Sequence, residues 1–272
     1  MPRASRDVCY YVVAHQDDWQ LFYGQQAFAD LSEPGSRVVF IYTTAGDAGL
    51  SEAWWRAREH GAVAAQTLPA GLEPPQNPDT VQIHGHQIAV YDSGSVVSYH
   101  MRLPDGNVPG NGFPSTGHVS LERLQIGCIS QIAAIDQSTV YTSWSDFCTT
   151  LGAILDREAS PRSAWVNAAD WNWNCSPQDH SDHKATANAL RKVFCDGGNA
   201  CHRLWFTTYS TKDRLANLAG EALRQKEMVW LAYKQRVEPL ADAAFLRWEW
   251  EAWGAKNYYR RVLAGEDDNG IC

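Results

Sequence analysis

Two short segments of the chain hold histidine and aspartate side chains at a density that could support metal-assisted hydrolysis. The first is Ala14-His15-Gln16-Asp17-Asp18, and the second is Asp179-His180-Ser181-Asp182-His183. Catalytic zinc sites combine histidine nitrogens with a carboxylate in a set of three protein ligands, which leaves one position open. Either segment alone could be a helix cap or ordinary surface. Together they predict a metal site.

The elements around these segments would bring them to one place. Asp7–Ala14 and Arg37–Thr43 are continuous apolar runs, typical of parallel strands that are covered on both faces, and Ala164–Ala169 resembles them. Trp19–Leu31, between the first two runs, has helical spacing. Ligands of open α/β sheets bind beyond the carboxyl ends of the strands. Both segments follow predicted strands, so we expect them at the same edge.

Alternation of strands and helices over most of the chain predicts an α/β fold, a Rossmann-like, mostly parallel sheet with helices on both faces. We expect one domain, residues 1–272, with a core over 1–210 that includes a loop-rich insertion at 69–114 and a helical cap at 211–272. The other expected elements are a helix at Ser51–Leu68, strand-like pieces at Gln87–Tyr91 and Val96–Leu103, and helices at His183–Phe194, Leu215–Lys234 and Leu240–Leu263. Leu121–Asp136, Thr139–Ser143 and Asp146–Arg157 continue the alternation of helix and strand, and Arg203–Tyr209 is expected to be a strand.

Composition excludes several classes of protein. The 272 residues include 23 basic and 31 acidic side chains, a net charge of −8, so the basic patch that nucleic-acid binding requires is not expected. No apolar run is long enough to span a membrane, and no convincing signal peptide is present, so we expect a cytoplasmic protein with a small-molecule substrate. Seven scattered cysteines without a Cys-x-x-Cys pair suggest neither a disulfide framework nor a thiolate zinc site.

A glycine-containing loop, Thr43–Gly49, follows the second predicted strand. Its glycines let the backbone approach a ligand closely. The loop lacks the Gly-x-Gly-x-x-Gly spacing of a dinucleotide site, which argues against a nicotinamide enzyme.

Four motifs in the same order resemble those of the PIG-L/LmbE-like zinc-dependent N-acetylglucosamine deacetylases. Ala14–Asp18 resembles the family's Ala-His-Pro-Asp-Asp motif, and His180–His183 resembles its His-Pro-Asp-His element. Thr44-Ala45-Gly46-Asp47 is similar to the Thr-x-Gly-Asp/Glu loop, and Arg56-Ala57-Arg58-Glu59 to the Arg-x-x-Glu helix. The length and the tryptophan-rich tail are most similar to the deacetylases of teicoplanin-type glycopeptide antibiotic biosynthesis.

The resemblance implies a zinc cofactor held by His15, Asp18 and His183. It also implies that Asp17 is the general base and that His180 stabilises the oxyanion. Gln16 and Ser181 replace the family's prolines, and Trp19 stands where glutamate is common, but no proposed ligand is lost. Residues expected to contact the substrate are Trp19, Thr44, Gly46, Asp47, Arg56 and Trp173.

The implied reaction is removal of an N-acetyl group from an N-acetylglucosamine attached to a glycopeptide pseudoaglycone. Two alternatives stay open: a zinc amidase of the same fold acting on another acylated amino sugar or a thiol-sugar conjugate, and a glycopeptide-binding module without activity. The late aromatics Trp248, Trp250 and Trp253 cannot all line one helix face, so at least some of them must pack in the core or at an interface.

Overall fold

The computed structural model describes residues 8–159, 164–197 and 201–270. Within these residues the chain forms one eight-stranded sheet flanked by helices, and a short two-stranded ribbon, β6 (Ile132–Ala133) with β7 (Val140–Tyr141). The strands of the large sheet are β1 (Val8–Val13), β2 (Arg37–Thr44), β3 (Asp79–Ile83), β4 (His86–Asp92), β5 (Val96–Leu103), β8 (Ala164–Ala169), β9 (His202–Thr207) and β10 (Tyr258–Val262). The helices are η1 (Trp19–Tyr23), α1 (Gly24–Ser32), α2 (Glu52–Thr67), η2 (Pro114–Thr116), α3 (Leu121–Gln125), α4 (Trp144–Arg157), α5 (Ser181–Gly197), η3 (Tyr209–Asp213), α6 (Gly220–Val237) and α7 (Ala243–Trp253).

The sheet has the order β10-β9-β8-β1-β2-β5-β4-β3. Its five central strands are parallel, and the outer strands β10, β4 and β3 pair antiparallel with their neighbours. The α/β class predicted from the sequence is therefore confirmed. In the described part of the chain, no helix is long and apolar enough to cross a membrane.

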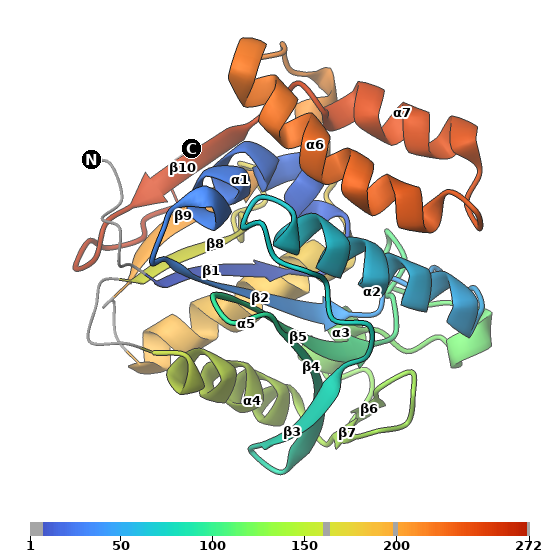
Figure 1. The fold of residues 1–272 in the computed structure, drawn as a ribbon. Coiled ribbons are helices and arrows are strands. Elements are labelled where there is room, and N and C mark those ends of the chain that lie inside the picture. Colours follow the sequence, from blue (N-terminus) through green and yellow to red (C-terminus); the bar gives the residue numbers. More distant parts are fainter. Residues whose placement is uncertain (1–7, 160–163, 198–200, 271–272) are drawn as a thin grey trace.

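Side chains of β1 alternate between two hydrophobic layers. Tyr10 and Val12 pack in the layer that includes Phe147 of α4 and Leu190 of α5. Tyr11 packs in the opposite layer, together with residues of α1, α2 and α6. Figure 1 shows α4 and α5 on one side of the sheet and α1, α2 and α6 on the other. A strand that is covered on both faces has no polar face, which explains the unbroken apolar run in the sequence.

Two segments differ from the sequence-based expectation. Within residues 69–114, β5 is buried along its whole length and pairs in parallel with β2, so it is a central strand of the sheet. The helix expected over Leu240–Leu263 is wrong beyond Trp253, because α7 ends there and Tyr258–Val262 pairs with β9 as an edge strand. Only alternate residues of that edge strand are well exposed, a period-2 pattern that five residues show too weakly to predict.

Candidate metal centre and active site

The two histidine- and aspartate-rich segments meet at the carboxyl end of the parallel strands. Residues 14–18 follow β1, and Ser181 begins α5, whose first turns carry His183. His183 Nε2 lies 2.9 Å from Asp18 Oδ1, and His15 Nδ1 lies 3.4 Å from the same oxygen. All three side chains are buried, and their ligand atoms lie within 4.8 Å of one another. The arrangement fits a cation held by two imidazoles and one carboxylate.

Asp179 orients one of these histidines. Its Oδ1 lies 2.8 Å from His183 Nδ1, on the side of the ring away from Asp18, and its Oδ2 accepts hydrogen bonds from Ser176 and Thr208. A carboxylate behind a ligating histidine fixes the tautomer and leaves the other nitrogen free to bind a metal. The ligand set therefore has the supporting contacts that metal sites require.

The carboxylates of the centre favour positive charge on the groups beside them. Burial would lower the pKa of His183, but Asp18 and Asp179 outweigh it and raise that pKa to about 10. Burial would raise the pKa of the Asp18 carboxyl, yet the two histidines hold it well below its usual range. In the absence of a metal, protons on the imidazoles neutralise the carboxylates. A divalent cation can replace these protons, since only the neutral imidazole binds metal.

Asp17, the neighbour of the candidate ligand, points to a different partner. Its carboxylate pairs with the buried guanidinium of Arg58, whose Nη1 also donates to the carbonyl oxygen of Gly46 at 2.9 Å. Asp17 itself is 8% exposed. Arg56, which is expected to contact the substrate, forms an exposed pair with Glu52 and faces another side of α2 than Arg58, because residues two apart on a helix point in different directions.

The glycine-containing loop, Thr43–Gly49, hydrogen-bonds to the backbone of the segments that carry the centre. Thr44 Oγ1 donates to the carbonyl oxygen of Ala14 at 2.9 Å, and Asp47 Oδ1 accepts from the backbone N–H of Asp105 at 2.7 Å. Gly46 has a φ of +55°, and a Cβ there would lie 2.6 Å from Oε1 of Gln16. A residue with a side chain would be strained at this φ, and its Cβ would displace the end of the Gln16 side chain.

The structure places the two tryptophans expected at the substrate in different settings. Trp19 is fully buried, and its Nε1 donates to the hydroxyl of Tyr42 at 2.9 Å. Trp173 is 54% exposed, with the ammonium of Lys184 3.5 Å from its ring centre. Neither tryptophan lines the cavity of about 680 Å³ that lies beside the candidate metal centre.

His180 lies beside the candidate ligands, with its ring centre 4.6 Å from that of His15. Its Nδ1 accepts from the backbone N–H of Asp182 at 3.2 Å, which places the proton of the neutral ring on Nε2. Burial, together with His15, lowers the pKa of His180 to about 4. At neutral pH without metal, His180 is therefore a neutral donor through Nε2.

A cavity of about 680 Å³ lies next to this centre. Tyr209 joins the two, because its ring lines the cavity and lies 5.1 Å from the ring of His183. The other wall comes from α7, a helix that the sequence did not connect with the site. The residues that line it are Val108, Pro177, Gln178, Tyr209, Ser210, Lys212, Asp213, Phe245, Trp248, Glu249 and Trp253.

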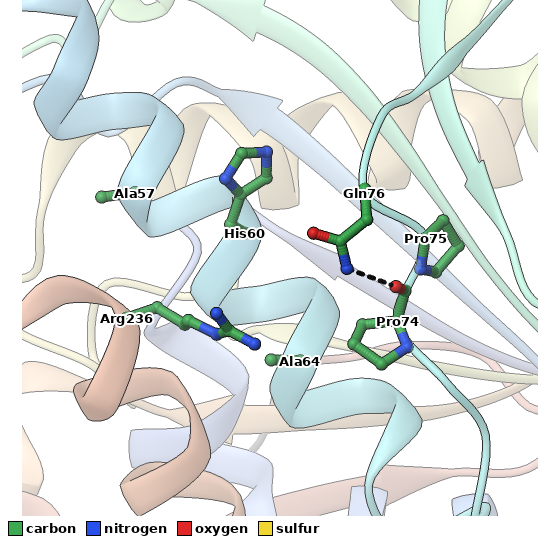
Figure 2. Close-up of a pocket in the computed structure, with 7 residues that line it drawn as sticks. All are labelled: Ala57, His60, Ala64, Pro74, Pro75, Gln76 and Arg236. Atoms are coloured by element: carbon green, nitrogen blue, oxygen red, sulfur yellow. Dashed lines mark hydrogen bonds between the residues drawn. The ribbon is translucent and has the colours of Figure 1, made fainter.

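Glu249 is the polar group of α7 in this wall and is 7% exposed. Burial and the charge of Asp17 raise its pKa well above the usual range, against the opposing effect of Arg58. The cavity therefore places among aromatic rings a carboxyl group that its surroundings make less acidic. A smaller pocket of about 230 Å³, between α2, the end of α6 and the loop at 74–76, includes no residue of the centre (Figure 2).

One cysteine is in a disulfide, which the spacing of the cysteines along the chain did not indicate. Cys175 takes part in a disulfide, whereas Cys128 and Cys201 are free thiols. The partner of Cys175 lies outside the described side chains. Spacing along the chain does not reveal which thiols meet in space.

No protein-family model and no curated protein sequence matches the chain. Among solved structures, it is similar to a deacetylase of the teicoplanin biosynthesis pathway, with a TM-score of 0.54 at 12% identity over 96% of this chain and 100% of that one. It is also similar to the A40926 pseudoaglycone deacetylase, with a TM-score of 0.51 at 14% identity over the same shares of the two chains. For the diacetylchitobiose deacetylase of Pyrococcus horikoshii, the TM-score is 0.49 at 15% identity, over 89% of this chain and 74% of that one. The first two similarities show that the chain shares the fold of those two deacetylases.

Proposed function

We propose that this chain is a zinc-dependent N-deacetylase that removes the acetyl group from an N-acetylglucosamine on a teicoplanin-type glycopeptide pseudoaglycone. The observation that carries the proposal is the buried triad of His15, Asp18 and His183, with the carboxylate of Asp17 beside it and a large cavity next to it. The fold shared with a deacetylase of the teicoplanin biosynthesis pathway and with the A40926 pseudoaglycone deacetylase supports the reaction class.

Zinc suits this donor set, because it accepts imidazole and carboxylate ligands in sites with an open position. When bound, it would supply Lewis-acid polarisation of the amide carbonyl and lower the pKa of a water ligand. The carboxylate of Asp179 behind His183 favours such a role, since it leaves Nε2 of that ring free for the metal.

Asp17 is the proposed general base. Its carboxylate would accept the proton of the attacking water and then deliver it to the leaving amine as the C–N bond breaks. Acetate and a free amino sugar are the products. Arg58 holds Asp17 in place through an ion pair with its carboxylate. His180 is a suitable donor to the tetrahedral oxyanion, because Nε2 carries its proton when the ring is neutral.

The cavity supports a substrate with a sugar and an aromatic part. Trp248, Trp253 and Tyr209 offer ring faces for stacking, while Lys212, Asp213 and Glu249 offer polar groups to sugar hydroxyls. Its volume of about 680 Å³ exceeds the space that one monosaccharide fills.

The direct test is mass spectrometry of an N-acetylglucosaminyl glycopeptide pseudoaglycone incubated with the protein. We expect the loss of one acetyl group, blocked by a chelator and restored by zinc. If zinc-loaded protein leaves this substrate intact but deacetylates other amino sugars, the glycopeptide assignment is wrong and the chemistry stands. Protein that binds no metal would contradict the proposal as a whole.

A further inference from the structure

The pocket of about 230 Å³ between α2, the end of α6 and the loop at 74–76 has no part in the proposed reaction. Figure 2 shows the side chains of His60, Gln76 and Arg236 reaching the same space from these three elements. Ala57 and Ala64 contribute only methyl groups to its wall, so the space between the longer side chains stays open. The pocket is smaller than the roughly 300–1,000 Å³ of sites for drug-sized ligands, so it suits an ion or a very small molecule.

Arg236 is a cation without a carboxylate partner in the part of the chain that the structure describes. The acidic residue nearest to it on α6, Glu238, pairs with Lys234 at 3.5 Å. Residues two apart on a helix point in different directions, so this pair does not compete for the side of the helix that Arg236 occupies. A guanidinium presents a planar fork of N–H donors that matches the oxygens of carboxylate and phosphate groups. Arg236 therefore has donors to offer a ligand in the pocket.

The ring of His60 offers a second donor. Among the described residues, its nitrogens have no hydrogen-bond or ion-pair partner, and its ring packs edge-on against Tyr91 with ring centres 6.3 Å apart. The carboxylate of Glu59, its neighbour in sequence, is held by Arg102 at 2.5 Å. Imidazole carries at least one N–H in either protonation state, so His60 can donate to a ligand at neutral pH.

The charges around the pocket favour an anion. Burial lowers the pKa of His60, against the opposing charge of Glu59. Three guanidinia lower this pKa as well, those of Arg56, Arg236 and Arg102. Arg56 and Arg102 already pair with carboxylates, so Arg236 is the cation whose charge a ligand can neutralise. Positive charge on the wall of a concave site attracts anions more strongly than the same charge on a flat surface.

We propose that this pocket binds a small oxyanion, a carboxylate or a phosphate, between the guanidinium of Arg236 and an N–H of His60. Gln76 is not a third donor, because its Nε2 donates to the carbonyl oxygen of Pro74 at 3.1 Å. The site shares no residue with the candidate metal centre or with the cavity beside it. It therefore stands or falls independently of the proposed deacetylation.

The test follows the histidine ring resonances of the zinc-loaded protein by NMR. Sodium phosphate and sodium acetate are added in separate titrations, with sodium chloride at equal ionic strength as the reference. The resonance of His60 is identified by its absence in His60→Gln. We expect phosphate, acetate or both to shift this resonance saturably and to raise the pKa of His60, because a bound anion stabilises the imidazolium. The anion that does so identifies which oxyanion the pocket prefers.

Two substitutions on α6 form a matched pair for this test. Arg236→Ala removes the charge-assisted hydrogen bonds and should weaken anion binding at least 10-fold. Arg224→Ala is the control, because Arg224 pairs with Glu221 on the surface and does not line the pocket. Thermal unfolding reports the fold of each variant, and Arg236→Gln, which keeps more of the side chain, replaces Arg236→Ala if the latter is unstable. The proposal is overturned if neither anion shifts the His60 resonance beyond the chloride reference, or if the folded Arg236 variant binds as tightly as the wild type.

Discussion

Asp17 and Asp18 are adjacent but face different partners. Asp18 faces two imidazoles, whereas Asp17 faces Arg58 and is not among the candidate metal ligands. Asp17→Asn should therefore lower kcat by about 10²- to 10⁴-fold, the range typical of a lost general base, and leave the zinc content unchanged. Steady-state kinetics combined with metal analysis of the same sample checks both parts. Near-normal turnover in the zinc-loaded variant would exclude Asp17 as the base.

Arg58 and Arg56 offer a matched pair of substitutions on one helix. Arg58→Met leaves the buried carboxylate of Asp17 without its partner, which should cost about 3–5 kcal/mol of unfolding free energy. Arg56→Met breaks only an exposed pair with Glu52 and should change stability by less than about 0.5 kcal/mol. Urea denaturation of both variants gives the comparison. Equal effects would mean that the Arg58–Asp17 pair contributes nothing specific to the fold.

The helix α7 carries tryptophans with two different roles. Trp248 lines the cavity beside the metal centre, whereas Trp250 stacks on Trp230 of α6, with ring centres 6.1 Å apart. Trp248→Ala should raise KM for a glycopeptide substrate by about 3- to 10-fold, the equivalent of one lost ring contact, with little effect on a free N-acetylated sugar. Trp250→Ala should lower the melting temperature without this change in KM. An unchanged KM in Trp248→Ala would remove that ring from the binding surface.

Buried strands made of continuous apolar residues were predictable as strands of the parallel sheet, and buried strands that carry polar residues were not. Continuous apolar runs indicated β1, β2 and β8 because nothing polar is tolerated on either face of these strands. The central position of β5 could not be predicted from the sequence. The strand lies in a loop-rich region, and its apolar residues are interrupted by Ser98, His100 and Arg102. These polar groups are buried against partners from other elements, and a single sequence does not show such long-range pairing.

Across the whole molecule, the candidate centre was predictable only where its residues are dense in sequence. His15 and His183 lie in short segments rich in potential ligands, so the pattern pointed to both. Asp105 and Glu249 come from a loop and from the C-terminal cap, with no local signal around them, whereas Arg58 lies in the Arg56–Glu59 motif but was not singled out there. They reach the centre only because the chain folds over the same sheet edge. Their roles could be inferred only from the structure.

The stability of the whole molecule should depend on pH through one buried histidine, His100, that is not among the candidate metal ligands. His100 is 2% exposed, stacks on Tyr42 with ring centres 4.6 Å apart, and has Nδ1 3.5 Å from Glu59. Burial lowers its pKa to about 4, and the carboxylate of Glu59 opposes this without overcoming it, while Arg102 adds to the lowering. The ring is therefore neutral in the native protein over a pH range in which it is charged in the unfolded chain.

Between pH 6.5, the usual histidine value, and pH 4, the unfolded state binds the proton of His100 and the native state does not. Unfolding free energy should therefore fall as pH falls through this window, by at most about 3 kcal/mol from this group. His100→Phe keeps a ring for stacking and should flatten the decrease by that amount. Urea denaturation at several pH values, with chelator present throughout, measures it. The exposed His84→Phe serves as control and should follow the wild type. If His100→Phe loses stability as steeply as the wild type, His100 is not the neutral group inferred here, and the acid sensitivity belongs to the other buried ionisable side chains.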